Sequence, residues 1–241
     1  SLLPLDTTTV NAVKSIAVIG EAAASGAYNA AGASQGQGGW HQGDYYSGGG
    51  SGHVTAGYVI SPLAGIAARA ATAGIRVLSC TNCTTEASVA MAKSVDVAIV
   101  VGGTTSGESV DRPNLTLDHG ADALIAAVAA ANPKTVALVA APGAFQTPWR
   151  GAVAACAALF LGGQESGAAW ASVLFGDAPP SGRLPITLPG DDAAHTIAPS
   201  EDETIEYTEG LATGYRSPAA TAAAAFPFGH GLSYTSFEYS W

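Results

Sequence analysis

Short apolar runs of strand length, separated by segments of helix length, constrain the fold of this 241-residue chain more than any other feature. Most of these runs are continuously apolar rather than alternating, which is typical of strands buried on both faces of a sheet. Strands that alternate with helices imply right-handed crossovers and a mostly parallel sheet. The sequence therefore predicts an α/β fold, with a mostly parallel six-stranded sheet and helices on both faces.

The predicted elements alternate as far as residue 189. Strands are expected at 15–20, 74–80, 95–103, 135–143, 157–163 and 183–189, and helices at 61–73, 84–94, 118–132, 146–155 and 165–175. Ser61 before Pro62 is a typical helix start, and Asn132 before Pro133 a typical helix end. We expect one domain over 1–241, with an α/β core at 1–189 and an irregular closing tail at 190–241.

The charge balance excludes several classes of partner. Nineteen acidic residues outnumber nine basic ones, and the formal net charge of −10 repels nucleic-acid phosphates and anionic lipid surfaces. The long apolar stretches are helical and diluted with alanine, so we expect no membrane span and no nucleic-acid partner. A surface rich in Ser, Thr, Gly, Asn and Gln suits a neutral, hydroxyl-rich ligand, although a biased genomic composition explains it equally well.

The three cysteines cannot all pair within one chain. Cys80 and Cys83 form a lone Cys-x-x-Cys without the second pair that a structural zinc site needs, so we expect no metal. Cys156 lies among alanines, where a buried and unreactive thiol is the expected state. Asn82 and Asn114 begin N-glycosylation sequons, which would be used if the chain passes through a secretory route.

A glycine-rich stretch at 21–57 follows the first predicted strand. It lacks the G-x-G-x-x-G spacing of a dinucleotide site, and we expect no cofactor. The sequence also has no G-x-S-x-G nucleophile elbow. Ligands of open parallel sheets bind beyond the carboxyl ends of the strands, so this stretch is either the lining of a site or a flexible linker.

One carboxylate stands out in the loop after the third predicted strand. Glu108 lies among small residues, which let a ligand approach, and is soon followed by Asp111 and Arg112. In a partly dry pocket, a raised pKa would let Glu108 act first as general acid and then as general base. The alternative is an exposed loop acid without a chemical role. Asp111 and Arg112 are expected to form a structural ion pair or to bond the loop backbone.

Several motifs resemble the C-terminal α/β sandwich domain of family 3 glycoside hydrolases, which is flavodoxin-like. The main one is Gly-Thr-Thr-Ser-Gly-Glu-Ser-Val-Asp-Arg-Pro-Asn-Leu-Thr-Leu at 103–117. Others follow in the family's order: Gly-Gly-Ser-Gly at 49–52, Gly-Gln-Glu-Ser-Gly at 163–167, Leu-Phe-Gly-Asp at 174–177, Pro-Ser-Gly-Arg-Leu-Pro at 180–185 and Phe-Pro-Phe-Gly-His-Gly-Leu-Ser-Tyr-Thr at 226–235. Because the motifs are collinear over nearly the whole chain, the resemblance is specific.

The resemblance implies a role for several residues. Glu108 matches the acid/base glutamate of β-glucosidases and β-xylosidases, and Gly50, Ser51 and Ser106 are expected to contact the substrate. Trp40 is expected to stack on a sugar ring, although simple packing of the aromatic residues explains it equally well.

The acid/base loop varies most within the family, which leaves other carboxylates open as candidates. A neighbouring loop length could bring Glu21 or Glu165 nearer the sugar instead of Glu108. Glu165 opens a predicted helix, whose dipole stabilises a negative charge, so a structural capping role near the site is expected for it.

The resemblance also implies a partner for this chain. Family members place a (β/α)8 barrel before this domain, and a barrel aspartate, commonly in Ser-Asp-Trp, is the nucleophile. No Ser-Asp-Trp occurs here, and the abrupt start at Ser1 suggests a piece of a longer secreted, cell-wall or vacuolar product. We expect an acid/base domain that is inactive alone and acts on β-linked oligosaccharides or glycosides with a barrel. The alternative is a free-standing, non-catalytic module that binds carbohydrate or protein.

Overall fold

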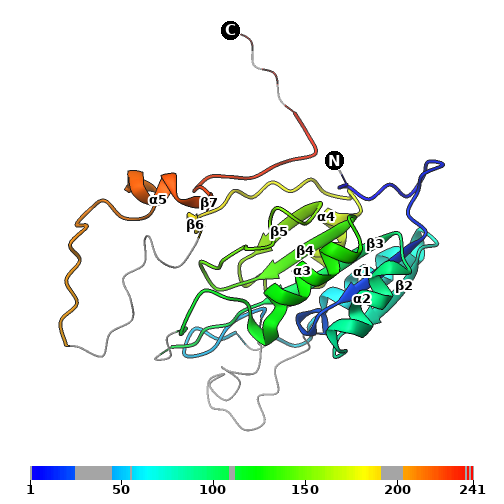
Figure 1. Cartoon of the computed structure of the whole chain (residues 1–241), viewed down its shortest axis with the longest axis horizontal. Coiled ribbons are helices and arrows are strands. Elements are labelled where there is room, and N and C mark those ends of the chain that lie inside the picture. The colour runs from blue at the N-terminus through cyan, green and yellow to red at the C-terminus, as the bar shows by residue number, and fades with distance from the viewer. Residues whose placement is uncertain are drawn as a thin grey trace.

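A five-stranded parallel sheet forms the centre of the molecule. The computed structural model describes residues 2–24, 45–54, 56–108, 112–190 and 203–236, together with 238 and 240. The strands are β1 (Ser15–Ile19), β2 (Arg76–Cys80), β3 (Val97–Gly103), β4 (Thr135–Ala140) and β5 (Ala155–Leu159). Their order is β2-β1-β3-β4-β5, and every neighbouring pair is parallel (Figure 1). The order reverses between β1 and β3, and such a switch point is where open sheets commonly bind ligands.

Two helices cover each face of the sheet (Figure 1). α1 (Pro62–Thr72) and α4 (Ser166–Leu174) pack on one face, and α2 (Thr85–Lys93) and α3 (Ala121–Ala131) pack on the other. The mostly parallel sheet with helices on both faces is therefore confirmed. In the part of the chain that the structure describes, no helix combines the length and apolar character needed to cross a membrane.

The strands are buried on both faces, as their continuous apolar runs predict. In β1, Ile16 and Val18 join the core under α1 and α4, while Ala17 and Ile19 join the core under α2 and α3. All four side chains have no exposed surface. Neighbouring side chains of a strand point to opposite faces, so a sheet between two helical layers needs apolar residues at consecutive positions.

Side-chain caps and glycines set the positions of the helices. The Ser61 hydroxyl accepts a hydrogen bond from the Ala64 N–H at the start of α1. Gly65 of α1 faces Gly167 of α4, and a Cβ placed on either glycine would lie 2.1 Å from a backbone oxygen of the other segment. The two helices therefore approach more closely than any larger residue would allow.

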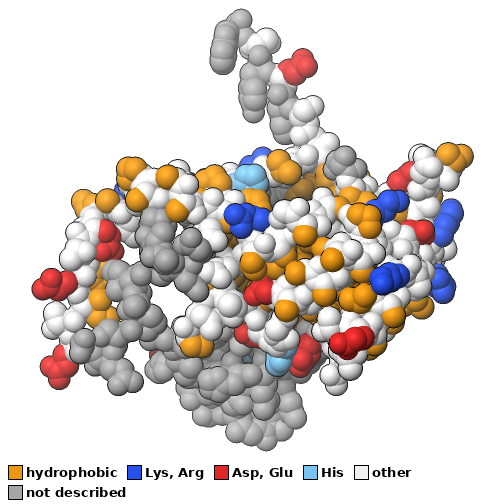
Figure 2. Space-filling view, in the orientation of Figure 1, with side chains coloured by type: hydrophobic (Ala, Val, Ile, Leu, Met, Phe, Trp, Pro, Cys, Tyr) orange, Lys and Arg blue, Asp and Glu red, His pale blue; other side chains and the backbone are white. Residues whose placement is uncertain are grey.

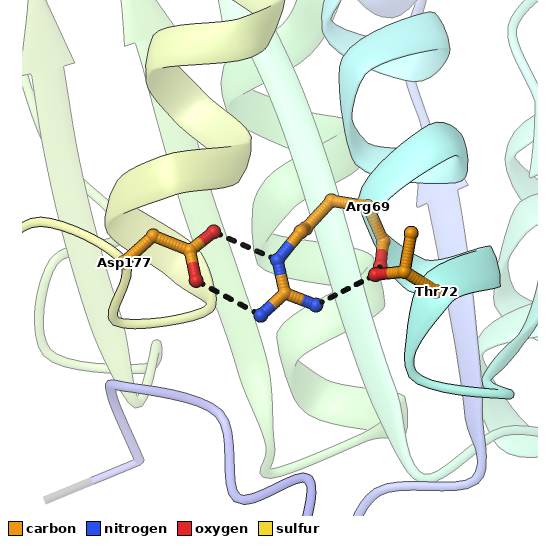
Figure 3. A network of polar contacts seen from close by, with 3 residues as sticks. All are labelled: Arg69, Thr72 and Asp177. Atoms are coloured by element: carbon orange, nitrogen blue, oxygen red, sulfur yellow. Dashed lines mark hydrogen bonds and ion pairs between the residues drawn. The ribbon is translucent and has the colours of Figure 1, made fainter.

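An exposed ion pair explains the aspartate of the Leu-Phe-Gly-Asp motif. Arg69 of α1 binds Asp177 through Nε and Nη2, at 2.7 and 2.9 Å, and its Nη1 donates to Thr72 (Figure 3). The guanidinium also lies over the Phe175 ring. Asp177 thus joins the end of α4 to α1, and its role is structural.

The sheet has one strand fewer than predicted. Within 183–189, only β6 (Leu188–Pro189) is a strand, and it pairs antiparallel with β7 (Ala224–Phe226) outside the main sheet. Pro185 and Pro189 lack the N–H groups that a central strand needs, which explains the difference.

Two further predictions near β5 are wrong. A helix was predicted at 146–155, but residues 146–154 form turns and bends and Ala155 begins β5; Trp149 in this segment donates a hydrogen bond to Asp122 of α3 at 2.7 Å. Cys156 is exposed rather than buried; it lies on β5, an edge strand with a neighbour on one side only, and the protein around its thiol still raises the thiol pKa.

The closing tail packs against the α/β domain near its carboxyl end. η4 (Gly214–Arg216) and α5 (Pro218–Ala222) precede β7, and the tail then runs along the body, where the Tyr234 hydroxyl donates to the Val173 carbonyl of α4 at 2.9 Å. The motif at 226–235 therefore anchors the tail on the core.

Candidate functional site

Two loops meet beyond the carboxyl ends of the strands. The first is 45–54, and the second, 104–108, follows β3. The Gly49 N–H donates to the Ser106 carbonyl at 3.0 Å, and the Gly163 N–H, in the loop after β5, donates to the Tyr46 carbonyl at 2.8 Å. These hydrogen bonds hold the glycine-rich loop across the sheet edge at which ligands of such folds bind.

The loops bring Glu108 and Ser51 into direct contact. The Ser51 N–H donates to Oε2 of Glu108 at 2.8 Å, and the Ser51 hydroxyl donates to the same oxygen. Gly50 makes this approach possible: its φ is +91°, and a Cβ placed on it would lie 2.4 Å from the Cβ of Glu108. The structure thus places Gly50, Ser51, Ser106 and Glu108 together; their contact with substrate stays a prediction.

Glu108 is exposed, and its charge is stabilised by the same contact. The hydrogen bonds from the hydroxyl and then the backbone N–H of Ser51 hold the pKa of Glu108 below its ordinary value. The carboxylate is therefore ionised at neutral pH and able to accept a proton. To donate one as a general acid, it needs surroundings that raise its pKa, and burial is the usual means.

Arg112 follows the Glu108 loop and approaches the loop after β4. Its guanidinium is half-buried, with Nη2 near Gly143 after β4. Burial lowers the pKa of Arg112, and the charge of Asp118 opposes that shift. Nη1 is buried and has no hydrogen-bond partner among the residues that the structure describes. Asp111 and Trp40 lie outside the described residues.

Glu165 belongs to a neighbouring contact rather than to the Glu108 pair. It occupies the N-cap position of α4, but its side chain makes no capping hydrogen bond. Instead its carboxylate accepts a hydrogen bond from the Tyr58 hydroxyl, which raises the pKa of Tyr58. Both side chains are largely exposed.

A separate cavity of about 200 Å³ lies beyond the ends of β1, β2 and β3. Its lining includes Glu21, Asp118 and His119, and the described lining residues do not include Glu108. Nδ1 of His119, a residue with a φ of +53°, lies 3.3 Å from Glu21. The buried Tyr45 donates to Asp118 at 3.3 Å, and burial together with that charge raises the pKa of Tyr45 far above its ordinary value.

A disulfide between Cys80 and Cys83 forms part of the cavity wall. Asn82 lies within this short loop and is exposed, as is Asn114 near the Glu108 loop. Both sequons are therefore accessible. Nowhere in the described ranges do three His, Cys, Asp or Glu side chains form a group that could hold a metal ion.

The contacts of Tyr45, Asp118 and His119 were not predicted. The pairing of Tyr45 with Asp118 spans 73 positions in the chain. A positive φ at a histidine has no compositional signal either. The one available indication was their position along the chain. Glu21 directly follows the first predicted strand, and Asp118 directly follows the loop after the third.

Known β-glucosidases share this architecture. Thermostable beta-glucosidase B of Acetivibrio thermocellus is 39% identical over 156 residues, which is 62% of this chain and 21% of the relative. Probable beta-glucosidase L of Neosartorya fischeri is 34% identical over 223 residues, 84% of this chain and 29% of the relative. The crystal structure of beta-D-glucoside glucohydrolase from Trichoderma reesei superposes with a TM-score of 0.83 at 31% identity, covering 100% of this chain and 35% of that one.

The chain thus spans about a fifth to a third of the length of these relatives. Residues 1–234 match the sequence pattern described as the glycosyl hydrolase family 3 C-terminal domain. The order of motifs, the parallel sheet and this match agree over nearly the whole sequence. The chain belongs to the family of glycosyl hydrolase family 3 C-terminal domains.

Proposed function

We propose that this chain supplies the acid/base glutamate, Glu108, of a retaining β-glycosidase that hydrolyses β-linked glucosides or xylosides. The relatives are named β-glucosidases, which supports a glycoside as substrate. In a retaining mechanism, one carboxyl group attacks the anomeric carbon, while the other protonates the leaving oxygen and later activates water. Glu108 takes the second role.

The observation that carries the proposal is the state of Glu108 itself. Its carboxylate is held in one place by Ser51, yet it is exposed and lies outside the described cavity. A fixed but uncovered acid at the ligand-binding edge needs a second surface to enclose the sugar. We propose that a (β/α)8 barrel provides that surface, together with the nucleophile.

The pKa of Glu108 gives a physical reason for this division. In the isolated chain its pKa is lowered, so the group lacks the proton that a general acid must donate. Covering the carboxylate with a second folding unit would remove water and raise the pKa. The isolated chain is therefore expected to be almost inactive.

The test uses the complete glycosidase, meaning this chain joined to or assembled with its barrel. Glu108→Gln should lower kcat/KM on a β-glucoside by about 10²- to 10⁴-fold. With an aryl β-glucoside whose leaving group needs no protonation, added azide, which needs no general base to attack the glycosyl-enzyme, should speed turnover of this variant and yield a glycosyl azide. Glu165→Gln is the matched control and should keep activity near the wild-type value.

Wild-type turnover by the Glu108→Gln enzyme would rule out the acid/base role. Calorimetry on the isolated chain separates the alternative of a non-catalytic module. Half of a pocket should bind glucose, cellobiose and xylobiose weakly, whereas tight binding by the chain alone would favour a dedicated carbohydrate-binding module.

Secretion and glycosylation form a further part of the proposal. Both Asn82 and Asn114 are exposed, as modification requires. We propose a secreted, cell-wall or vacuolar protein that carries glycans at these positions. A mass decrease of the native protein on treatment with an N-glycosidase tests this, and an unchanged mass would contradict it.

A further inference from the structure

An extended arm, residues 203–216, ends in η4 and leads into α5. Figure 1 shows it beyond the carboxyl ends of the strands, on the same side as loops 45–54 and 104–108. Every residue of the arm is exposed. Its backbone hydrogen bonds, such as that from Gly210 to Tyr207 at 3.1 Å, lie within the arm or lead into the adjoining turn.

The arm carries large apolar side chains that the described part of the chain leaves uncovered. Tyr207 is 67% exposed, Leu211 78% and Tyr215 61%, and Ile205 is also exposed. The ring of Tyr215 contacts Phe228 of the tail at 4.7 Å between centroids, and the Arg216 guanidinium lies over the same ring at 5.8 Å from its centroid. A cluster of uncovered apolar residues on one segment marks an interaction surface.

We infer that the arm is a docking surface for the (β/α)8 barrel of the same enzyme. This inference rests on the proposed function. Two observations favour this occupant over a second copy of the chain. The chain spans about a fifth to a third of its relatives, so most of each relative lies outside the matched domain. The arm also extends on the side of Glu108, where the proposed pocket must be closed.

The side chains of the arm define the surface that it meets. Glu203, Glu206 and Glu209 alternate with the apolar residues, and Arg216 is the only basic residue of the arm. Figure 2 shows acidic and apolar side chains side by side on this part of the molecule. The matching barrel surface should have apolar hollows for Tyr207 and Leu211, with Lys or Arg around them.

Hydrogen exchange tests the inference directly. We expect the amides of the arm to exchange about tenfold or more slowly in the complete glycosidase than in the isolated chain, because docking removes open states of the backbone. Tyr207→Asp and Leu211→Asp, made together, should return the arm of the complete enzyme to fast exchange. Both side chains are exposed in the isolated chain, so the double variant should unfold there at the wild-type temperature.

Two controls separate this inference from the proposed function. Val10→Asp changes an equally exposed apolar residue, 98% exposed, in the amino-terminal segment on the opposite side of the molecule (Figure 1). It should leave arm exchange unchanged. Glu108→Gln should lower kcat/KM by the same roughly 10²- to 10⁴-fold and leave the arm protected. If Glu108→Gln stays active while the arm is protected, the acid/base role fails and the docking surface stands.

Three results would overturn the inference. Equal exchange of the arm in the isolated chain and the complete enzyme means that the barrel does not cover it. Protection of the arm in the isolated chain that disappears on dilution means that a second copy is the occupant. Continued protection in the double variant means that Tyr207 and Leu211 do not hold the arm.

Discussion

Two acidic regions lie at the same edge of the sheet and differ in their surroundings, although both carboxylates are exposed. Glu21 lines a cavity beyond β1 and β2, next to His119 and a disulfide. Glu108 lies after β3, exposed, outside that cavity and bound to Ser51 of the glycine-rich loop. The region with the cavity has no matching catalytic motif, and the described cavity does not include the motif-bearing Glu108.

Under the proposed function, the concave surface on this domain is not the active site. A pocket built between two folding units is open when one unit is seen alone. The better indicator is a reactive group whose position is fixed by hydrogen bonds and by a glycine that permits close approach. Glu108, with Ser51 and Gly50, meets that criterion.

The comparison is tested most severely at Gly50. Gly50→Ala in the complete glycosidase should lower kcat/KM about a hundredfold. The new methyl group would push Glu108 away, and even a small displacement of the proposed acid from the leaving oxygen slows proton transfer. Gly52→Ala is the matched control, since nothing lies within 4 Å of a Cβ at that position. Steady-state kinetics with a β-glucoside would show the contrast, and equal effects of both changes would contradict it.

The Cys80–Cys83 disulfide in the cavity wall should stabilise the folded chain without contributing to catalysis. Cys83→Ser should lower the free energy of unfolding by about 2 kcal/mol, because it removes a cross-link from the unfolded chain. Urea denaturation of the isolated chain measures this. In the presence of a thiol reductant, wild type and variant should unfold alike; a persistent difference would show that the serine, rather than the lost cross-link, is responsible.

Titration of Glu108 tests whether Ser51 holds its carboxylate in the ionised form. Ser51→Ala should raise that pKa toward its ordinary value, as followed by carboxyl-carbon NMR of the isolated chain. Because the pKa of Glu108 is lower in the folded chain than in the unfolded one, the ionised carboxylate stabilises the fold at pH values above the ordinary pKa. This stabilisation is lost as the pH falls through the pKa of the folded chain. The stability difference between wild type and variant should therefore be present at neutral pH and vanish in acid. Ser106→Ala is the control, because Ser106 contacts the glycine loop through its backbone oxygen.

The smallest effect is expected at the cavity. Glu21→Gln in the complete glycosidase should change kcat/KM by about twofold or less, since the half-exposed carboxylate is paired with His119 and the described lining of its cavity does not include Glu108. The same assay as for Gly50 measures it. A loss as large as that of Glu108→Gln would make the cavity the active site and would reverse the comparison.

The strands at the centre of the sheet and the start of α1 were predictable from the sequence, whereas the segments at the edge of the sheet were not. β1 and β3 follow from unbroken apolar runs, and α1 follows from Ser61 and Pro62 at its start. The run at 183–189 has the same apolar look, but its prolines keep it out of the main sheet. Cys156 was expected to be buried because alanines surround it in the sequence, and the sequence does not show that its strand lies at the edge.

The candidate site divides in the same way. The motif around Glu108 pointed to this residue, because local composition and order along the chain carry the resemblance. The bond between Ser51 and Glu108 joins residues 57 positions apart, and no local pattern specifies such a pair.

The sequence by itself determined the fold class, the family and the identity of the candidate acid, because these depend on periodicity and on motifs read along the chain. Only the tertiary structure decided that Glu108 is held by Ser51, that it is uncovered, and that the described cavity lies elsewhere. Those properties depend on which loops the folded sheet brings to one edge, and on how closely their backbones approach.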